Sequence, residues 1–329
     1  MTLLMVSCGN SGNDNLAGGG IGGTGYTSVG PITALGSIFV NDIEFETTNA
    51  AITLNGVQSG EKELQVGMVV KVEGTVNADG KTGKAERIIF ENNAAGPIGS
   101  VDLGKSTMEV MGQTVFVDKQ TIIAGLPVNT LGLEGLAAND MVEISGLADA
   151  NGNLLATRIT LKPPVRQAMV GGRISSLTAT TFKINALTVD YSTATLNNVG
   201  STGIQTGDIV AVTGSLTSSA TLLADIVERK SPNYKNNNSA RCQGFIETLY
   251  YSGQSVSGFA MITPLGLQRI DLDASTTFSG GSTVKVGARV QVEGTVNNNI
   301  IQARMVNVLE SVKMQGSNTT MMSASLYGP

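Results

Sequence analysis

The feature that most constrains this 329-residue chain is a short phrase that its sequence repeats four times. The four copies are GMVVKVEG from Gly67, NDMVEISG from Asn139, GDIVAVTG from Gly207 and GARVQVEG from Gly287. Their terminal glycines lie about 70 to 80 residues apart, and self-similarity at such a spacing marks repeated structural units. Because this spacing is long enough for a complete small domain, the phrase predicts four tandem domains.

Two further markers accompany the phrase in every repeat. The opening markers are GPITAL from Gly30, GPIGSV from Gly96, GRISSL from Gly172 and GFIETL from Gly244. The closing markers are AERII from Ala85, ATRIT from Ala156, ADIVE from Ala224 and ARMVN from Ala303. All three markers keep the same order in every repeat, which indicates four copies of one fold.

The spacing of apolar residues within the markers is typical of β-strands, whose side chains alternate between two faces. In the repeated phrase, the residues expected to face inward are Val70 and Val72, Val142 and Ile144, Val210 and Val212, and Val290 and Val292. In the closing strand, the inward pairs are Ile88 and Phe90, Ile159 and Leu161, and Val306 and Val308. The third repeat places Arg229 after Val227 instead, so we expect that strand to end early.

Turn signals and further short strands complete each repeat. The last two strands are separated by NADGK, DANGN and NNN, at residues 77–81, 149–153 and 297–299, and Asp-Gly and Asn-Gly pairs are typical of tight hairpins. Middle hairpins are expected at 37–46 and 107–117, short strands near 51, 121 and 276, and a single helical turn within 131–140. Five or six strands in so short a segment avoid open sheet edges best by closing into a small barrel.

These patterns predict an all-β chain of four tandem small antiparallel β-barrels, OB-like in kind and arranged as a bead-like rod. The expected segments are a lipoprotein-like signal end and Gly-rich tether at 1–28, barrels at 29–93, 95–165, 168–232 and 241–310, and a C-terminal tail at 311–329. Among the linkers, residues 231–240 (SPNYKNNNSA) are expected to be flexible and to allow a bend before the fourth barrel.

The composition excludes several classes of function. A net charge of −5 and an aromatic content of 4% do not suit the cationic grooves and stacking platforms of nucleic-acid-binding proteins, so we expect no nucleic-acid partner. The absence of histidine excludes a His general base and mixed Cys/His zinc sites. Two cysteines, Cys8 and Cys242, cannot form a CxxC motif. No apolar run is long enough for a transmembrane helix.

The N-terminal stretch MTLLMVSCGN carries an apolar run that ends in Val-Ser-Cys. This stretch resembles the lipobox of bacterial lipoproteins, and the resemblance assigns lipid attachment to Cys8. The Gly/Ser/Asn-rich segment that follows is typical of a flexible tether. Gly9 after the cysteine favours, by the same resemblance, the outer membrane, with the protein on its periplasmic or cell-surface face or outside the cell. The alternative is an unmodified thiol at Cys8; with Cys8 lipidated, Cys242 is a lone thiol that suits a buried position.

The full marker order is G-x-I, a V-N-G-like hairpin, V-G-x-x-V-x-V-x-G and then A-x-x-I. This order is similar to that of the family catalogued as domain of unknown function 5666. The resemblance covers residues 29–310 and is strongest in the first and fourth repeats, whereas the second repeat has Asn139 at a glycine position. It implies tandem domains in an exported bacterial protein, often behind a lipoprotein signal, and it brings no catalytic residues with it.

Few residues are candidates for a site. Arg87 and Arg158 occupy equivalent outward places on the closing strand, where an anion or partner patch is one interpretation and surface ion pairing the stronger one. Asp271 and Asp273 alternate in RIDLDAS and could bind a cation or do acid–base chemistry, although a solvated face is the more common meaning of such a pair.

The turn at Asp149 is the other candidate, because Asp149, Asn151 and Asn153 alternate as in a calcium loop. The twelfth position of such a loop would be Thr160 and not a bidentate glutamate, so the ligand set is incomplete. We therefore predict no catalytic, cofactor-binding or metal-binding residues, no cofactor and no enzyme activity.

Two functions of different classes remain open. The first is a structural or interaction scaffold at the cell envelope, held to the membrane only by a lipid, which self-assembles or docks to a protein partner by strand addition through barrel edges or the tail at 311–329. The second is a periplasmic or surface ligand-binding module, with a glycan or a cation bound at a barrel rim or in a groove between barrels.

Overall fold

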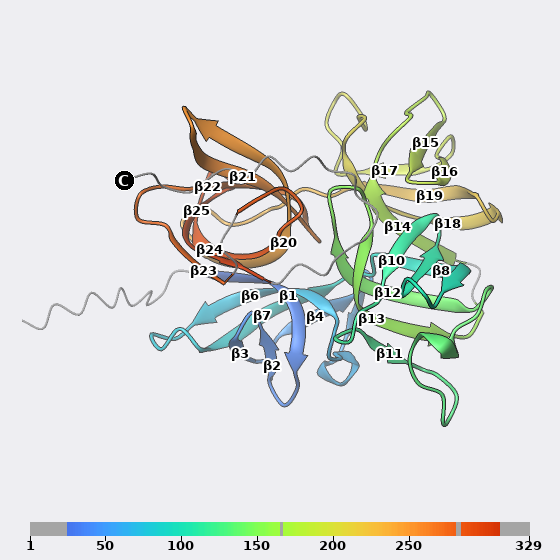
Figure 1. The fold of residues 1–329 in the computed structure, drawn as a ribbon, viewed down its shortest axis with the longest axis horizontal. Coiled ribbons are helices and arrows are strands. Elements are labelled where there is room, and N and C mark those ends of the chain that lie inside the picture. The colour runs from blue at the N-terminus through green and yellow to red at the C-terminus, as the bar shows by residue number, and fades with distance from the viewer. Residues whose placement is uncertain (1–24, 165–166, 281–283, 310–329) are drawn as a thin grey trace, which may run out of the picture.

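The computed structural model of the chain describes residues 25–164, 167–280 and 284–309. In these residues the regular secondary structure is β-strands and two short 3-10 helices, and the strands form four small barrels (Figure 1). No helix within these three segments has the length and hydrophobicity that crossing a membrane requires. The prediction of an all-β chain with four tandem OB-like barrels is confirmed.

The strands follow the repeats in order. The first barrel contains β1 (Tyr26–Ala34), β2 (Ile38–Val40), β3 (Ile43–Glu46), β4 (Ala51–Leu54), β5 (Val57–Ser59), η1 (Glu61–Glu63), β6 (Val69–Val76) and β7 (Thr82–Phe90). The second contains β8 (Ala94–Asp102), β9 (Thr107–Val110), β10 (Gln113–Phe116), β11 (Ile122–Ala124), η2 (Leu133–Gly135), β12 (Met141–Ala148) and β13 (Leu154–Lys162).

The other two barrels repeat this pattern. The third contains β14 (Gln167–Arg173), β15 (Thr181–Ile184), β16 (Leu187–Asp190), β17 (Thr195–Asn197), β18 (Ile209–Ser218) and β19 (Thr221–Arg229). The fourth contains β20 (Ser239–Ser252), β21 (Ser255–Thr263), β22 (Gly266–Asp271), β23 (Thr277–Gly280), β24 (Arg289–Asn297) and β25 (Ile300–Val308). The predicted hairpins, short strands and helical turn are confirmed. The expected early end of the third closing strand is wrong, since β19 runs through Arg229.

Each barrel has the strand order of an OB fold, and in the third barrel the first two strands meet through an isolated bridge between Ser175 and Lys183. In the first barrel β1 pairs with β2, β2 with β3, β3 with β7, β7 with β6, and β6 with β1. The pair of β3 and β7 is parallel, as are β10 with β13, β16 with β19, and β22 with β25. A parallel pair joins strands far apart along the chain, so local periodicity, which predicted mainly antiparallel pairs, did not reveal it.

The glycine that ends each repeated phrase lies at a β-bulge. The ladder between the last two strands of every barrel shifts register at this glycine. A Cβ atom there would lie only 2.0 to 2.3 Å from a carbonyl oxygen of the partner strand. Gly74, Gly146, Gly214 and Gly294 therefore recur because a side chain would collide with the backbone, and the bulge helps the strand to curve around the barrel.

The first residue of the phrase also recurs for a backbone reason. Gly67, Asn139, Gly207 and Gly287 have φ values of 89°, 72°, 95° and 80°. This left-handed region favours glycine and admits asparagine more readily than other side chains. Asn139 therefore meets the same backbone requirement as the three glycines.

The barrel interiors are built from the predicted inward residues. All eight inward positions of the repeated phrase are buried, as are Ile88, Phe90, Ile159, Val227 and Val306, while Leu161 and Val308 are half-buried. The first and fourth barrels have separate apolar cores, whereas the cores of the second and third form one continuous cluster. The prediction that these residues line the barrel interiors is confirmed, although the second and third barrels share one core.

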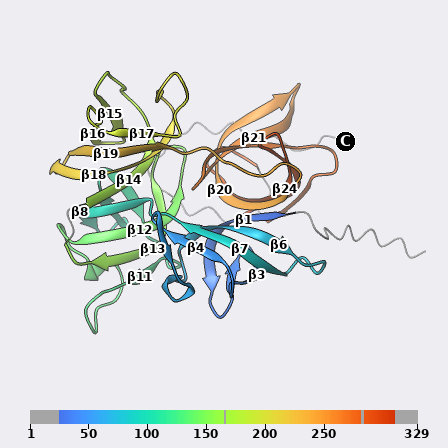
Figure 2. The same ribbon diagram turned by 180° about the vertical axis from the view of Figure 1, so that it is seen from behind.

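The barrels do not lie end to end, so the expected rod is wrong. Residues 26–29 of β1 pair in parallel with residues 239–242 of β20, which joins the first and fourth barrels in one 13-stranded sheet. β8 pairs with β14, which joins the second and third barrels in a 12-stranded sheet. Both views show the first barrel beside the fourth and the second beside the third (Figures 1 and 2).

The linker at 231–240 is also different from the prediction. Tyr234 is buried in the core of the fourth barrel, and the Asn237 amide donates a hydrogen bond of 2.9 Å to the Val296 carbonyl. The prediction of a flexible linker is therefore wrong. The segment is mostly polar, but its one aromatic side chain packs inside the fourth barrel.

Candidate functional site

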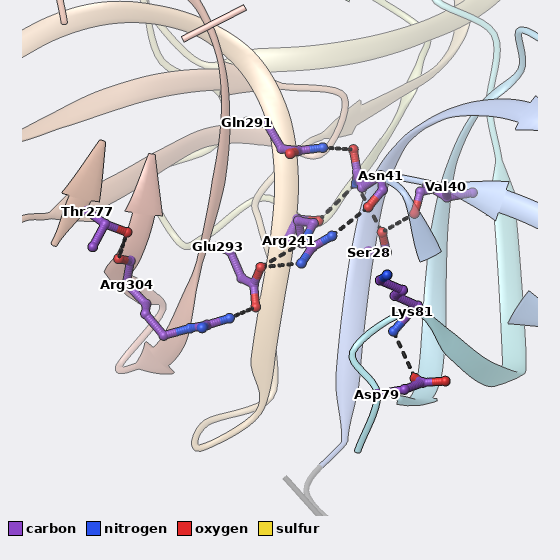
Figure 3. Close-up of polar contacts among 10 residues, drawn as sticks. All are labelled: Ser28, Val40, Asn41, Asp79, Lys81, Arg241, Thr277, Gln291, Glu293 and Arg304. Carbon is purple, nitrogen blue, oxygen red and sulfur yellow. Dashed lines mark hydrogen bonds and ion pairs between the residues drawn. The ribbon is translucent and has the colours of Figure 1, made fainter. Parts of the chain in front are cut away.

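A buried polar network joins the first barrel to the fourth, and Asn41 lies at its centre (Figure 3). This residue occupies the turn between β2 and β3 with a φ of 53°. Its Nδ2 donates to the carbonyl oxygens of Val29 at 3.0 Å and Arg241 at 3.2 Å. Its Oδ1 accepts from the side-chain amides of Gln243 at 2.8 Å and Gln291 at 3.3 Å. One side chain thus ties β1 to both β20 and β24.

Charged groups continue this network toward solvent. Nη1 of Arg241 donates to the Asn41 carbonyl at 2.7 Å, and its Nε donates to Oε2 of Glu293 at 2.9 Å. Arg304 also pairs with Glu293, but its side chain is 70% exposed, against 8% for Glu293. Buried ion pairs add little net stability, yet losing one partner is costly because it leaves an uncompensated charge. The network is therefore suited to fixing the orientation of the two barrels.

The second and third barrels meet through their middle hairpins. Gly112 has a φ of 70°, and a Cβ atom there would lie 2.6 Å from the Leu187 amide nitrogen. The side-chain amide of Gln113 donates to the Ile184 carbonyl at 3.3 Å, and Asn185 Nδ2 donates to Gln113 Oε1 at 2.7 Å. The turn of one barrel is thus seated directly on the turn of the other.

Arg158 connects the two pairs of barrels, and Arg87 does not. Arg158 is buried, its Nη1 donates to the Val66 carbonyl at 3.0 Å and its Nη2 to the Gln65 side chain. Desolvation lowers the pKa of this guanidinium. Arg87 stays exposed and pairs with Glu73 at 3.6 Å, as the ion-pair interpretation predicted. The interpretation of the two arginines as an equivalent outward pair is wrong for Arg158, since packing between barrels covers only one of them.

The two predicted carboxylates of the fourth barrel do not act together. Asp271 ends β22 and pairs with Arg269 Nε at 2.8 Å. Asp273 lies beyond that strand and accepts a hydrogen bond of 2.8 Å from the Ser275 amide. Hydrogen bonds, first from the Ser275 side chain and then from its amide, lower the pKa of Asp273. One carboxylate thus serves an ion pair and the other a turn.

The alternating polar residues at Asp149 are explained by hydrogen bonds within their own turn. Asp149 Oδ1 accepts from the amides of Asn151 and Asn153, both at 2.8 Å, which closes the hairpin between β12 and β13. Across the described segments, no three His, Cys, Asp or Glu side chains gather as they would around a metal ion.

A cavity of about 90 Å³ lies where all four barrels meet. The first barrel contributes residues of β6 and β7, the second the turn at 148–154, the third residues 171–173 and 209–211, and the fourth the turn at 262–265. One water molecule needs roughly 10–15 Å³, so the space could hold several waters or a small ligand. No single repeat contains this cavity, since it exists only once the four barrels have assembled.

Three basic side chains line the cavity. Lys71 Nζ pairs with Glu73 at 2.6 Å and donates to the Asn233 carbonyl at 3.3 Å. Lys230 Nζ contacts Glu91 at 2.7 Å and Glu228 at 3.2 Å. The third, Arg173, pairs with Glu247 of the fourth barrel. The rim of the cavity is therefore charged, and each of its basic side chains is paired with a carboxylate.

The repeats match a known family model, described as Domain of unknown function (DUF5666), at residues 29–89, 95–160, 171–228 and 262–306. The chain belongs to this family. Each DUF5666 match contains one repeated phrase with its bulge glycine. The fourth match begins after β20, so the strand that joins the first barrel lies outside it. No curated protein matches the chain.

The structure tests the prediction for Cys242 but not the one for Cys8. Cys8, predicted to carry lipid, lies outside the described residues. Cys242 is buried, as expected for a small apolar residue, and burial raises the pKa of its thiol to about 12. Sequence reasoning missed the Asn41 network and the cavity, because both are assembled from segments that are distant in sequence.

Proposed function

We propose that this protein is a non-enzymatic cell-envelope lipoprotein that serves as an interaction scaffold, held at the outer membrane by a lipid on Cys8. The observation that carries the proposal is an apolar loop, between β11 and η2, exposed on a body whose barrels are interlocked. The lipobox-like Val-Ser-Cys sequence and the Gly-rich segment after it support the anchor.

The loop has the chemistry of a partner contact. Val128 is 90% exposed and Leu131 is 85% exposed, while Leu133 and Leu136 just beyond them are buried in the core. Exposed apolar side chains in a soluble body favour contact with another surface. Because its base is anchored, the loop can bind without first becoming ordered.

The strand before this loop offers a second contact. β11 pairs only with β13 among the strands that the structure describes. An unpaired strand edge can accept an extended segment from another chain. We therefore infer that β11 and the loop at 125–132 form one docking face for a second copy or a protein partner.

The docking face is tested by measuring self-association with light scattering and partner capture by pull-down. Val128→Ser together with Leu131→Ser should weaken both and leave thermal unfolding nearly unchanged. The matched control is Val57→Ser on the first barrel, where Val57 is 65% exposed. Unchanged association in the double variant would contradict this face, and deletion of 311–329 tests the tail separately.

The anchor is tested by mass spectrometry of protein purified from native membranes. We expect a diacyl or triacyl adduct on Cys8 and its loss, with release from the membrane, in Cys8→Ser. An unmodified Cys8 in membrane-bound protein would exclude this anchor.

A second candidate function is ligand binding between the barrels, which the cavity at their junction favours. The residues described around it include no aromatic ring, so they do not favour a stacked glycan, and the three basic side chains among them are each paired with a carboxylate.

A further inference from the structure

We propose that the outward face of β19, the last strand of the third barrel, binds the fourth barrel of a second copy of this chain. The inference rests on the proposed scaffold function, to which it gives a partner and a surface separate from the loop at 125–132. Its basis is a contact that the protein already makes within itself, between the first and second barrels.

This internal contact shows how the last strand of one barrel receives another barrel. On the second barrel, Leu155 is 1% exposed and belongs to the same apolar cluster as Val69 of the first barrel. The Thr157 hydroxyl donates to the Gly67 carbonyl at 2.6 Å, and the Ser145 hydroxyl accepts from the Val69 amide at 2.8 Å. The second barrel thus receives the segment that begins the repeated phrase of the first.

The third barrel has a matching surface that is not covered. The bulge glycine of each ladder aligns the two barrels and places Leu223 at the position of Leu155. Thr213 takes the position of Ser145 in the same way, so a hydroxyl is again present. Leu223 is 37% exposed, and Ile226 on the same strand is 41% exposed. The receiving face of the second barrel is therefore repeated on the third, but in contact with water.

The fold itself does not require these apolar side chains. The first barrel has Lys84 and Arg87 at the positions of Leu223 and Ile226. Charged side chains suit a strand face that stays in water, whereas a pair of exposed apolar ones favours contact with another surface. The third barrel is thus the one that presents an uncovered apolar pair at these two positions.

The fourth barrel presents the segment that fits such a face. Residues 285–287 align with residues 65–67 of the first barrel, because Gly287 and Gly67 begin the repeated phrase with similar positive φ values of 80° and 89°. A Cβ atom at Gly67 would lie 2.6 Å from the backbone of the second barrel, whereas one at Gly287 would meet no atom within 4 Å. Val286 is 41% exposed. The segment that the first barrel uses for docking is therefore still exposed on the fourth.

Charge complementarity favours this pairing. Asp225 takes the position of Thr157 on the third barrel, and Lys285 takes the position of Gln65 on the fourth. Neither side chain forms an ion pair within the part of the chain that the structure describes. Docking by the internal contact would bring the two together, and opposite charges across an interface select the partner and fix the register.

The contact joins different copies of the chain. Within one chain Val286 and Leu223 are both exposed, so the two surfaces do not cover each other. Because they lie on different barrels, the interface is heterologous and copies associate head to tail, as a ring or a filament.

Sedimentation velocity of the full chain over a range of concentrations tests the interface. We expect the wild-type chain to associate as its concentration rises. Leu223→Ser together with Ile226→Ser should weaken association about tenfold or more, while Leu103→Ser, at a leucine that is 56% exposed on the second barrel, should leave it unchanged. A wild-type chain that stays monomeric, or a double variant that associates as before, would overturn the proposal.

Charge exchange identifies the partner segment. Asp225→Lys and Lys285→Glu should each weaken association roughly fivefold, because like charges then meet. Mixing the two variants should restore association, since every contact again joins opposite charges, and a mixture that stays dissociated would contradict the assignment to residues 285–287.

The scaffold proposal is separable from this inference. Association that is lost in the Leu223 and Ile226 variant but kept in the Val128 and Leu131 variant supports the β19 interface and excludes the loop face. The reverse result supports the loop face and overturns the β19 interface.

Discussion

The first and fourth barrels are joined by different physical means from the second and third. The 1–4 junction is a parallel strand pair reinforced by the Asn41 network, between two separate cores. The 2–3 junction also has a strand pair, β8 with β14, and the hydrogen bonds of Gln113, but here one apolar core runs through both barrels. The two junctions therefore differ in the shared core, which adds non-directional burial to the 2–3 junction.

The difference between the two junctions follows the sequence separation of the barrels that they join. The second and third barrels are neighbours in sequence, so apolar contact is enough to hold them together. The contact of Asn41 with Arg241 spans 200 residues, and the first barrel must select the fourth from similar repeats. A wrong partner would leave buried hydrogen-bonding groups unpaired, which costs more than a poor apolar fit. Met111, at the equivalent turn of the second barrel, has the same φ of 53° but buries an apolar side chain.

The sharpest test of the polar junction is Asn41→Leu. The substitution removes all the hydrogen bonds that the Asn41 side chain makes, and it places a γ-branched side chain at positive φ. The five partners that lose a bond are Ser28, Val29, Arg241, Gln243 and Gln291. We expect a loss of about 4 kcal/mol in the free energy of unfolding by urea. Hydrogen exchange should quicken in β1 and β20 first, and Asn41→Gly should behave similarly with about 1 kcal/mol less loss. A loss below about 1 kcal/mol in Asn41→Leu would show that the strand pair alone holds the junction.

The apolar junction is tested by Leu187→Ala. Leu187 is fully buried in the shared core, so we expect a loss of about 3 kcal/mol. Because the core is continuous, hydrogen exchange should quicken in both the second and the third barrels. Val40→Ala is the control, and its effect should stay in the first barrel. Loosening of the third barrel alone by Leu187→Ala would argue against a shared core.

Arg241 and Arg304 both pair with Glu293, so their variants compare a buried ion pair with an exposed one. Arg241→Met should cost about 2 kcal/mol, since Glu293 is buried and keeps only its exposed partner. Arg304→Met should cost at most about 0.5 kcal/mol, because the Arg304 side chain is mostly in water. Equal losses in urea unfolding of the two variants would contradict the view that buried contacts define this junction.

A modest effect is expected in the response of the 1–4 junction to alkaline pH. Cys242 lies opposite Val29 in the β1–β20 pair, and its thiol pKa is raised to about 12 by burial. The unfolded thiol ionises near pH 8.5, so this group's contribution is complete below that pH and declines as pH rises toward 12. We expect a loss of about 1 kcal/mol between pH 8 and 9.5. In urea unfolding, Cys242→Ala should reduce the decline of the free energy of unfolding between pH 8 and 9.5. An equal decline in the variant would show that other groups cause the loss.

The candidate site was less predictable than the fold, for a physical reason. Asp273 and Asp149 stand out in the sequence because they are charged and lie in alternating patterns, yet each carboxylate accepts hydrogen bonds within its own turn. Lys230 and Asn41 carried no local signal. Their importance comes from neighbours in other barrels, and no window of sequence contains those neighbours.

Short segments of the chain specify the four barrels, their inward residues and their turns. Alternation of apolar residues, positive φ and the space around a bulge glycine are properties of short segments, so they can be read along the chain. The pairing of the first barrel with the fourth and of the second with the third, and the cavity between them, become apparent in the assembled fold. Those features depend on which strand edges and buried polar groups meet, and such meetings are set by the free energy of the whole assembled chain.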